Sequence, residues 1–467
     1  MPGRRPDIIL IHCHDLGRWL SCYGQAGVPS PRLHRFAEES VVFERAFATA
    51  PLCSPARGSL FTGLSPHRHG LMGLAHHAWR YREGVVTLPE RLGELGYETA
   101  LVGLQHEHTD PDVIGFGQVH GSGFLPRAAQ VTEAAASWLE HRASSGVETP
   151  YFLTVGIWEV HRPWPAEDYE HDDPSAVHVP GYLPDNPHTR QDVAAFHGAI
   201  RNLDTAVGRL LDRVDQLCDP DRTLVVFTTD HGAPFPRAKG TLYDPGTGVA
   251  LIVRPPRSWN ARPCHREELV SHLDVVPTFL EIAGADPSET EDVLEGLSLL
   301  RLLRPSGTAD EPLNSDSVDA AEAFDSGPVG RLVPTQKTHH DTYDPMRALR
   351  SDRYKYIRNF VAGPRLLLSQ DLEESITRRG LGEDHLLPRP WEELYDLAAD
   401  PDELHNVAED ARYAEVLDTF RRRLAQWMRQ TADPLLRGTV PPPPPRSRAV
   451  DALPPLEPAR SGTYTPE

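Results

Sequence analysis

The chain has 467 residues, of which 24% are charged and 39% are hydrophobic, and its formal net charge is −20. This length is enough for one large domain and a smaller one, and the composition is typical of a soluble globular protein. The acidic balance argues against a nucleic-acid or membrane partner, and an anionic substrate would need a local basic pocket.

The first residues predict a strand rather than a targeting segment. The apolar run from Ile8 to Ile11 is too short for the hydrophobic region of a signal peptide. Five scattered cysteines, an odd number, favour reduced thiols over a disulfide framework: Cys13, Cys22, Cys53, Cys218 and Cys264. We therefore expect a cytoplasmic protein.

Short β-branched runs alternate with helical patterns along the chain. The clearest helical pattern spans about residues 190–216, where apolar residues recur at steps of three and four. Near-continuous apolar runs predict strands covered on both faces at 7–13, 99–103, 151–157, 223–229 and 249–254. This alternation predicts an α/β fold with a mainly parallel central sheet flanked by helices.

Residues able to do chemistry follow several of these strands, and ligands of such sheets bind beyond the carboxyl ends of the strands. The residues are His14-Asp15, His106, His161 and Asp230-His231. The sequence therefore predicts one site at a single edge of the sheet.

Composition divides the chain into four parts. We expect a catalytic α/β domain over 1–305 and an acidic loop or insertion over 306–330. A smaller C-terminal β/α subdomain should cover 331–433, because 346–360 alternates like an antiparallel strand pair. The proline-rich tail 434–467 is predicted to be disordered.

The segment from Cys53 to Gly63 is the most informative. It reads C-x-P-x-R and, after four residues, Thr-Gly. Pro55 suits the first turn of a helix, so Cys53 would lie near a helix N-terminus, where free N–H groups favour an anion. Arg57, one turn on, could lean back and offer its fork to a tetrahedral oxyanion. The alternative is a buried structural cysteine ahead of an ordinary helix.

This segment resembles the signature of type I sulfatases, which belong to the alkaline phosphatase superfamily. The resemblance implies that a formylglycine-generating enzyme oxidises Cys53 to formylglycine, whose hydrate is the nucleophile. One hydrate oxygen would attack sulfur in line, and the second hydroxyl would then lose its proton as the aldehyde reforms and sulfate leaves. The resemblance covers most of residues 6–285 and returns at 340–410.

The family holds one divalent cation between an Asp-Asp pair after the first strand, a later Asp-Asn or Asp-His pair and the formylglycine. By this resemblance Asp15, Asp230, His231 and Cys53 are metal ligands, and His14 stands where the family usually has an aspartate. The family's cation is calcium, but two imidazoles soften the site and make manganese or zinc plausible. His14 could instead point away or support a ligand by a hydrogen bond.

Other residues match family positions that contact the sulfate. Lys239 resembles the lysine that binds it, and would offset charge on the sulfuryl oxygens together with Arg57. His161 matches a histidine that binds the ester oxygen or protonates the leaving group. Glu159, two residues before His161, would share its face on a strand and contact His161 or the substrate.

His106 keeps the histidine of the family segment Gly-Lys-x-His, but Leu104 stands where the lysine is expected. One sulfate-facing cation is therefore missing from its usual place. The candidates for its replacement are His76, His77, His108 and Arg162.

Several stretches resemble heparan N-sulfatase (sulfamidase)-like bacterial sulfatases most closely. They include 65–74, 178–187 and 233–237, and the pair His339-His340 ahead of Arg347. We expect His339, His340 and Arg347 to contact the substrate. The resemblance implies a saccharide or small-molecule sulfate ester or sulfamate as substrate.

Two alternatives remain open at this stage. A phosphonate or phosphate diester hydrolase on the same fold is favoured by His14, by the Asp230-His231 pair and by the lysine missing at Leu104. A catalytically degenerate binding protein is the second, and the intact Cys53 and its motif argue against it.

Overall fold

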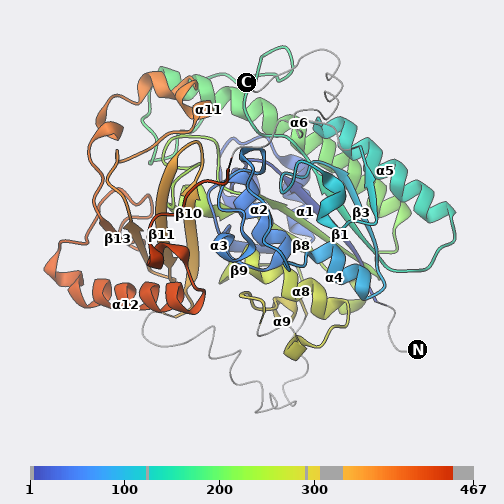
Figure 1. Ribbon diagram of the computed structural model, residues 1–467. Coiled ribbons are helices and arrows are strands. Elements are labelled where there is room, and N and C mark those ends of the chain that lie inside the picture. The colour runs from blue at the N-terminus through green and yellow to red at the C-terminus, as the bar shows by residue number, and fades with distance from the viewer. Residues whose placement is uncertain (1–4, 122–125, 290–292, 305–329, 445–467) are drawn as a thin grey trace.

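The computed structural model describes residues 5–121, 126–289, 293–304 and 330–444 (Figure 1). Its larger sheet has nine strands in the order β4-β3-β5-β1-β6-β8-β2-β7, with β9 paired to β2. The strands are β1 (Asp7–Cys13), β2 (Val41–Phe47), β3 (Glu98–Gly103), β4 (Gln118–His120), β5 (Tyr151–Gly156), β6 (Thr223–Thr229), β7 (Gly248–Val249), β8 (Leu251–Arg254) and β9 (Cys264–Ser271).

The centre of this sheet is parallel. β1 runs parallel to both β5 and β6, and β3 runs parallel to β4 and β5. β8 is antiparallel to β6 and β2. The prediction of an α/β fold with a mainly parallel sheet is confirmed.

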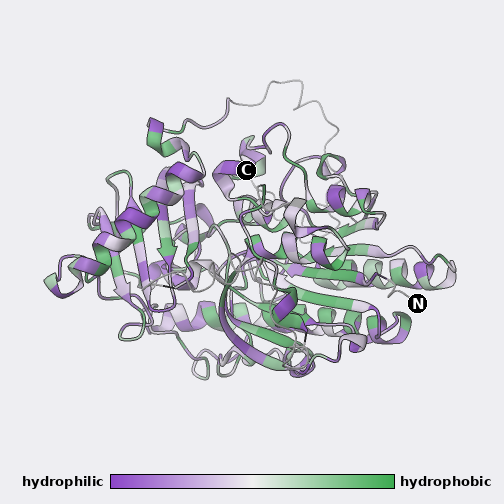
Figure 2. Cartoon of the chain, turned by 90° about the horizontal axis from the view of Figure 1, so that it is seen from below, coloured by the Kyte–Doolittle hydropathy of each residue, from purple (hydrophilic) through white to green (hydrophobic). Residues whose placement is uncertain are grey.

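Helices cover both faces of the sheet, and β1 shows why its whole sequence is apolar. Ile9 and Ile11 pack among α1 (Pro31–Glu38), α5 (Ala128–Ser144) and α6 (Pro187–Leu217). Ile8 and Leu10 point the other way, toward α2 (Cys53–Thr62), α4 (Leu88–Glu94) and α8 (Val275–Ile282). Figure 2 shows the central strands largely as hydrophobic ribbon between these two layers.

Apart from α12 (Ala414–Gln430), the remaining helices are short. The α-helices among them are α3 (Pro66–His69), α7 (Asp244–Thr247) and α9 (Leu300–Leu303), and α3 packs beside α2. Turns of 3-10 helix lie at Ser21–Tyr23, Ala75–His77, Pro111–Ile114, Arg257–Trp259, His272–Asp274, Pro287–Glu289, Thr377–Gly380, Asp384–Leu386, Ala411–Tyr413 and Pro434–Arg437. Over the described ranges, no helix is both long and apolar enough to cross a membrane.

The C-terminal part is a four-stranded antiparallel sheet, β10 (Val333–His339), β11 (Tyr343–Arg350), β12 (Tyr354–Asn359) and β13 (Glu392–Asp396). α12 (Ala414–Gln430) covers one face with a stripe that includes Leu417, Phe420 and Leu424. The other face packs against Leu242 and Tyr243 of the larger domain. The expected small β/α subdomain is therefore present (Figure 1).

Between β12 and β13 the chain leaves the small sheet over residues 360–391, and we call this segment the excursion. It contains α11 (Gln370–Glu373) and returns to the larger domain, where Asn186 Nδ2 donates to the Gly380 carbonyl at 3.0 Å. No pattern in the sequence predicts this segment.

Two predicted segments lie mostly outside the described residues. The acidic insertion at 306–330 is described only at residue 330, and the tail only as far as residue 444. The described start of the tail differs from the prediction, because Pro434–Arg437 is helical and the Val440 side chain is buried against Leu71 and Trp79.

Candidate active site

The site is built where two neighbouring parallel strands end. Cys13 at the end of β1 is in register with Thr229 at the end of β6, so the residues that follow each strand emerge at one edge. The backbone N–H of Asp15 donates to Asp230 Oδ1 at 2.9 Å. This contact joins two segments that lie far apart in the sequence.

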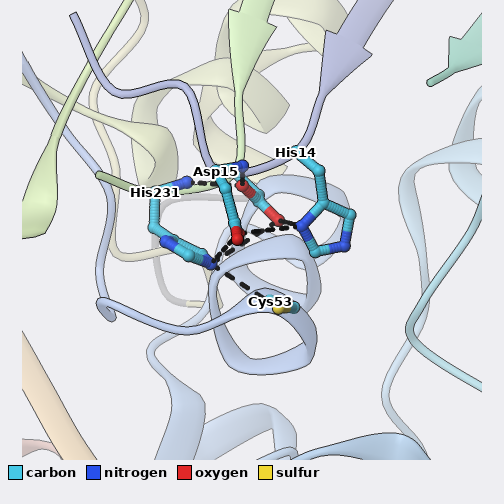
Figure 3. A group of neighbouring side chains, drawn as sticks. His14, Asp15, Cys53 and His231 are labelled. Atoms are coloured by element: carbon cyan, nitrogen blue, oxygen red, sulfur yellow. Dashed lines mark hydrogen bonds and ion pairs between the residues drawn. The ribbon is translucent and has the colours of Figure 1, made fainter. Parts of the chain in front are cut away.

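Cys53 enters the site from the other side, at the first residue of α2. Its Sγ lies 3.5 Å from His231 Nε2, and Figure 3 shows both side chains directed toward His14 and Asp15. Burial would raise the pKa of the Cys53 thiol, but His14, His106 and His231 lower it well below its ordinary value. The predicted position of Cys53 at a helix N-terminus is confirmed.

Five ligand atoms meet here, all within 4.8 Å of one another and all from buried residues: His14, Asp15, Cys53, Asp230 and His231. His14 Nδ1 lies 3.0 Å from Asp15 Oδ1 and 3.1 Å from Asp230 Oδ2. His231 Nε2 lies 3.0 Å from Asp15 Oδ1. Two buried carboxylates this close to each other need positive charge, and carboxylate oxygen with imidazole nitrogen is a donor set that fits a divalent cation.

Protons on the two imidazoles would supply that charge whenever no cation is bound. Burial would lower the pKa of His14, but Asp230 and the Cys53 sulfur raise it to about 9. For His231 burial acts in the same direction, and Asp230 and Asp15 raise the pKa well above its ordinary value. Because a metal is bound by neutral imidazole, a cation here would displace these protons.

Arg57 supports the cluster from behind and does not face position 53. Its side chain is completely buried, and its Nε and Nη2 both lie 3.2 Å from Asp230 Oδ2. The other donors contact His12 Nδ1 at 2.6 Å and the Cys13 carbonyl at 3.2 Å. The expectation that Arg57 leans back toward position 53 and offers its fork to an oxyanion is not met, since Asp230, His12 and Cys13 take its donors.

Lys239 lies on the other side of Asp15. Its Nζ is 2.8 Å from Asp15 Oδ2, 3.3 Å from His161 Nε2 and 2.7 Å from Asp371 Oδ2. His161 Nδ1 lies 2.6 Å from the Arg162 carbonyl, so Nδ1 carries the hydrogen and Nε2 accepts from Lys239. Burial, together with the Lys239 ammonium, lowers the pKa of His161 to about 4.

Asp371 is a site residue that the sequence does not predict. It belongs to α11 in the excursion, and its side chain is 16% exposed while that of Lys239 is 2% exposed. The run Ser369 to Glu374 reads like any exposed helix start. Only the return of the excursion to the larger domain brings its carboxylate to Lys239.

Two further histidines, His106 and His76, lie beside the cluster. The His106 ring lies 5.7 Å from the His14 ring, centre to centre, and stacks on His76 at 5.6 Å. Leu104 is buried, and its backbone donates to the Gly156 carbonyl. Arg162 does not replace the lysine, because it is bound by two hydrogen bonds, of 2.8 and 2.6 Å, to Asp192. The His340 ring contacts the Asp341 carboxylate, with 3.1 Å between Nδ1 and Oδ1.

The structure corrects two predicted substrate contacts. Glu159 Oε2 accepts the N–H of Ala128 at the start of α5, because β5 ends at Gly156 and its two-residue alternation stops there. Arg347 is completely buried and binds Asp433 through Nε at 2.5 Å and Nη2 at 3.0 Å. A guanidinium with no exposed surface cannot reach a substrate.

His339 is also engaged elsewhere. Its Nε2 lies 2.9 Å from the Val440 carbonyl, and its ring packs between Trp79 and Tyr343. These contacts place His339 under the described start of the tail, and they do not support the predicted substrate role.

Comparisons with known proteins agree with this architecture. A family model described as Sulfatase matches residues 6–285. N-sulphoglucosamine sulphohydrolase of Homo sapiens is 27% identical over 481 residues, which cover 92% of this chain and 91% of that protein.

Solved structures of low identity share the fold. One, from work on the metabolism of multiple glycosaminoglycans by Bacteroides thetaiotaomicron, has a TM-score of 0.70 at 18% identity and covers 94% of this chain and 100% of its own. Phosphonate monoester hydrolase of Agrobacterium radiobacter has a TM-score of 0.64 at 19% identity, with 91% and 96% covered.

Proposed function

The chain belongs to the sulfatase family, enzymes that hydrolyse sulfate esters, and we propose that it does so with a formylglycine made from Cys53. The observation that carries this proposal is the position of Cys53. Its sulfur lies at the start of the buried helix α2. It is beside the carboxylates and imidazoles of the residues that follow β1 (His14 and Asp15) and β6 (Asp230 and His231). The substrate is a sulfated saccharide or a small sulfate ester or sulfamate, as the human relative's name suggests.

Asp15, Asp230, His14 and His231 would hold one divalent cation, with the modified residue 53 beside them. Such a cation stabilises negative charge on the transferred group, and a formylglycine hydrate supplies the attacking oxygen. Calcium is the ion expected from the family, and the two imidazoles make manganese or zinc the alternatives.

The chain's own residues hold and protonate the substrate. Lys239 would donate to a sulfuryl oxygen, and His106 would contact the group at position 53. Lys239 Nζ and His161 Nε2, 3.3 Å apart, would bring a proton to the oxygen or nitrogen that leaves sulfur. Arg57 keeps Asp230 charged and oriented without touching the substrate.

The decisive experiment is mass spectrometry of the peptide that contains Cys53, from protein made together with a formylglycine-generating enzyme. We expect the mass of the aldehyde or its hydrate, and turnover of 4-nitrophenyl sulfate that rises with the modified fraction. An active preparation whose residue 53 is entirely thiol would rule out the proposed nucleophile.

A second candidate is hydrolysis of phosphonate monoesters or phosphate diesters. It is favoured by the imidazole of His14 within the ligand cluster and by the missing lysine at Leu104. Turnover of 4-nitrophenyl sulfate and of a 4-nitrophenyl phosphonate monoester, measured with calcium, manganese and zinc in turn, separates the two. A higher kcat/KM for the phosphonate with every metal would favour the second candidate.

A further inference from the structure

The ammonium of Lys239 has no free hydrogen in this structure. Its three acceptors are Asp15, His161 and Asp371, at 2.8, 3.3 and 2.7 Å. A sulfuryl oxygen can therefore bind Lys239 only by competing with one of them. Asp15 is completely buried, whereas the Asp371 side chain is 16% exposed and lies on the solvent side. The competitor that a substrate meets is Asp371.

Asp371 is held in place by its neighbours. Ser369 Oγ donates to Asp371 Oδ1 at 2.5 Å, and the Gln370 N–H donates to Asp341 Oδ2 at 3.0 Å. Further along the excursion, the N–H and the hydroxyl of Thr377 both donate to Asp192 Oδ2, at 3.1 and 2.7 Å.

Asp192 connects this anchor to the site, because it also binds Arg162, the residue after His161. The same buried ion pair thus fixes the excursion and the segment that carries His161. The Asp371 carboxylate is therefore held in a fixed position by its hydrogen bonds and does not move freely at the surface. Burial would raise its pKa, but the Lys239 ammonium lowers it below its ordinary value, so the group is charged at neutral pH.

The formal charges around the site follow from these contacts. The carboxylates of Asp15 and Asp230 would balance a divalent ion, and Arg57 adds one positive charge behind Asp230. Lys239 and Asp371 cancel each other. With neutral imidazoles these groups and the ion would together carry a single excess positive charge, which matches a sulfate monoester or a sulfamate. A group with two negative charges would face the Asp371 carboxylate without a cation to compensate.

We propose that Asp371 is a specificity-determining residue that restricts the site to transferred groups with one negative charge. The accepted classes are sulfate monoesters, sulfamates and the singly charged phosphonate monoesters and phosphate diesters, and the rejected class is the phosphate monoesters. This inference rests on the proposed function of the site.

The test uses two substrates with the same leaving group, 4-nitrophenyl sulfate and 4-nitrophenyl phosphate, at pH 8, where the phosphate ester carries two charges. Asp371→Asn removes the charge and keeps the shape. We expect the ratio of kcat/KM for phosphate to that for sulfate to rise about tenfold. An unchanged ratio in Asp371→Asn, and in Asp371→Ala should the first variant not fold, would overturn the proposal.

Glu373→Gln is the matched control. It removes the same charge from the same helix, but its side chain is 48% exposed and pairs with Arg378 rather than Lys239. We expect the substrate ratio of this variant to equal that of the parent protein. A rise as large as that in Asp371→Asn would assign the effect to the general charge of α11 and would contradict a role for Asp371.

Binding of inorganic phosphate separates this inference from the proposed function, because it needs no turnover. In calorimetry on metal-loaded protein with an unmodified Cys53, Asp371→Asn should bind phosphate about tenfold more tightly than the parent protein. Tighter binding in a protein that never hydrolyses sulfate esters would uphold the role of Asp371 and remove the proposed function. Unchanged binding in an active sulfatase would do the opposite.

Discussion

At the residue scale, the sequence motif identifies the site residues but does not determine where their side chains point. The motif predicts Cys53 and Arg57 together, and the structure brings both to the cluster. Arg57, however, gives its donors to Asp230, His12 and the Cys13 carbonyl. The positions of Asp230, His12 and Cys13 depend on how β1 and β6 pair. The spacing within the Cys53 motif carries no information about that pairing.

Removal of the Cys53 side chain should abolish turnover without unfolding the chain. Cys53→Ala deletes one small side chain at the start of α2, and we expect the rate with 4-nitrophenyl sulfate to fall by at least about 10³-fold. Thermal melting should change little. Cys264→Ala, a cysteine at the start of β9 far along the chain, is the control and should keep full activity. Residual activity of Cys53→Ala within tenfold of the parent would refute the nucleophile.

Asp230 should be required for the metal as well as for the rate. Its carboxylate contacts His14 Nδ1 at 3.1 Å and receives the N–H of Asp15 at 2.9 Å. Asp230→Ala should therefore lose bound metal, measured by elemental analysis after dialysis, and turnover should drop by about 10³-fold or more. Asp286→Ala, an exposed aspartate, should retain both. A variant of Asp230 with full metal content would contradict the ligand assignment.

At the scale of elements, what the sequence predicts depends on periodicity. The apolar repeat of α6 and the near-continuous apolar runs of the central strands are long enough to locate these elements, and Asp15 and Asp230 follow directly from the strand ends. The excursion has no such period, since α11 spans only Gln370–Glu373. Asp371 could therefore not be assigned to the site in advance. Glu159 was misplaced for a related reason, because β5 ends three residues before it.

The buried pair between Arg162 and Asp192 should hold the excursion in place. Asp192→Asn leaves a buried guanidinium without its counter-charge, so we expect the free energy of unfolding to fall by about 3–5 kcal/mol in urea titrations. KM for 4-nitrophenyl sulfate should rise, because the segments carrying His161 and Asp371 both depend on this pair.

Asp185→Asn, just before the start of α6, is the matched control for Asp192→Asn. Asp185 also forms a two-bond pair, with Arg190 at 2.6 and 2.7 Å, but its side chain is 54% exposed. We expect this variant to lose much less stability than Asp192→Asn, because water screens the exposed Asp185–Arg190 pair. Equal losses in the two variants would show that burial of the Arg162 pair contributes nothing.

At the scale of the whole molecule, the two sheets meet across buried charges as well as apolar side chains. Asp244 of α7 forms ion pairs with the Lys355 ammonium of β12, at 2.8 Å, and with the Arg350 guanidinium of β11, at 3.2 Å. Burial would raise the pKa of Asp244, but Lys355 and Arg350 lower it well below its ordinary value. Glu403, which is completely buried, accepts the N–H of Asp244.

Glu403 should make the stability of the molecule fall as the pH rises. Burial raises the pKa of its carboxyl group from 4.5 to about 8, against the effect of Lys355. Below pH 4.5 both the folded and the unfolded chain hold the proton. Between pH 4.5 and 8 the unfolded chain has released it while the folded chain keeps it, so the contribution of this group to stability is progressively lost.

Glu403→Gln isolates this effect, because glutamine keeps the acceptor for the Asp244 N–H but cannot titrate. We expect Tm of the parent protein to decrease from pH 5.5 to 8.5 by more than Tm of the variant, in melts followed by circular dichroism in buffers of equal ionic strength. Carboxylates with lowered pKa values, such as Asp244, lose their contribution only at lower pH, so they are common to both proteins across this window. Identical pH profiles would mean that Glu403 is already ionised in the folded chain at pH 5.5, with Lys355 outweighing its burial between the two sheets.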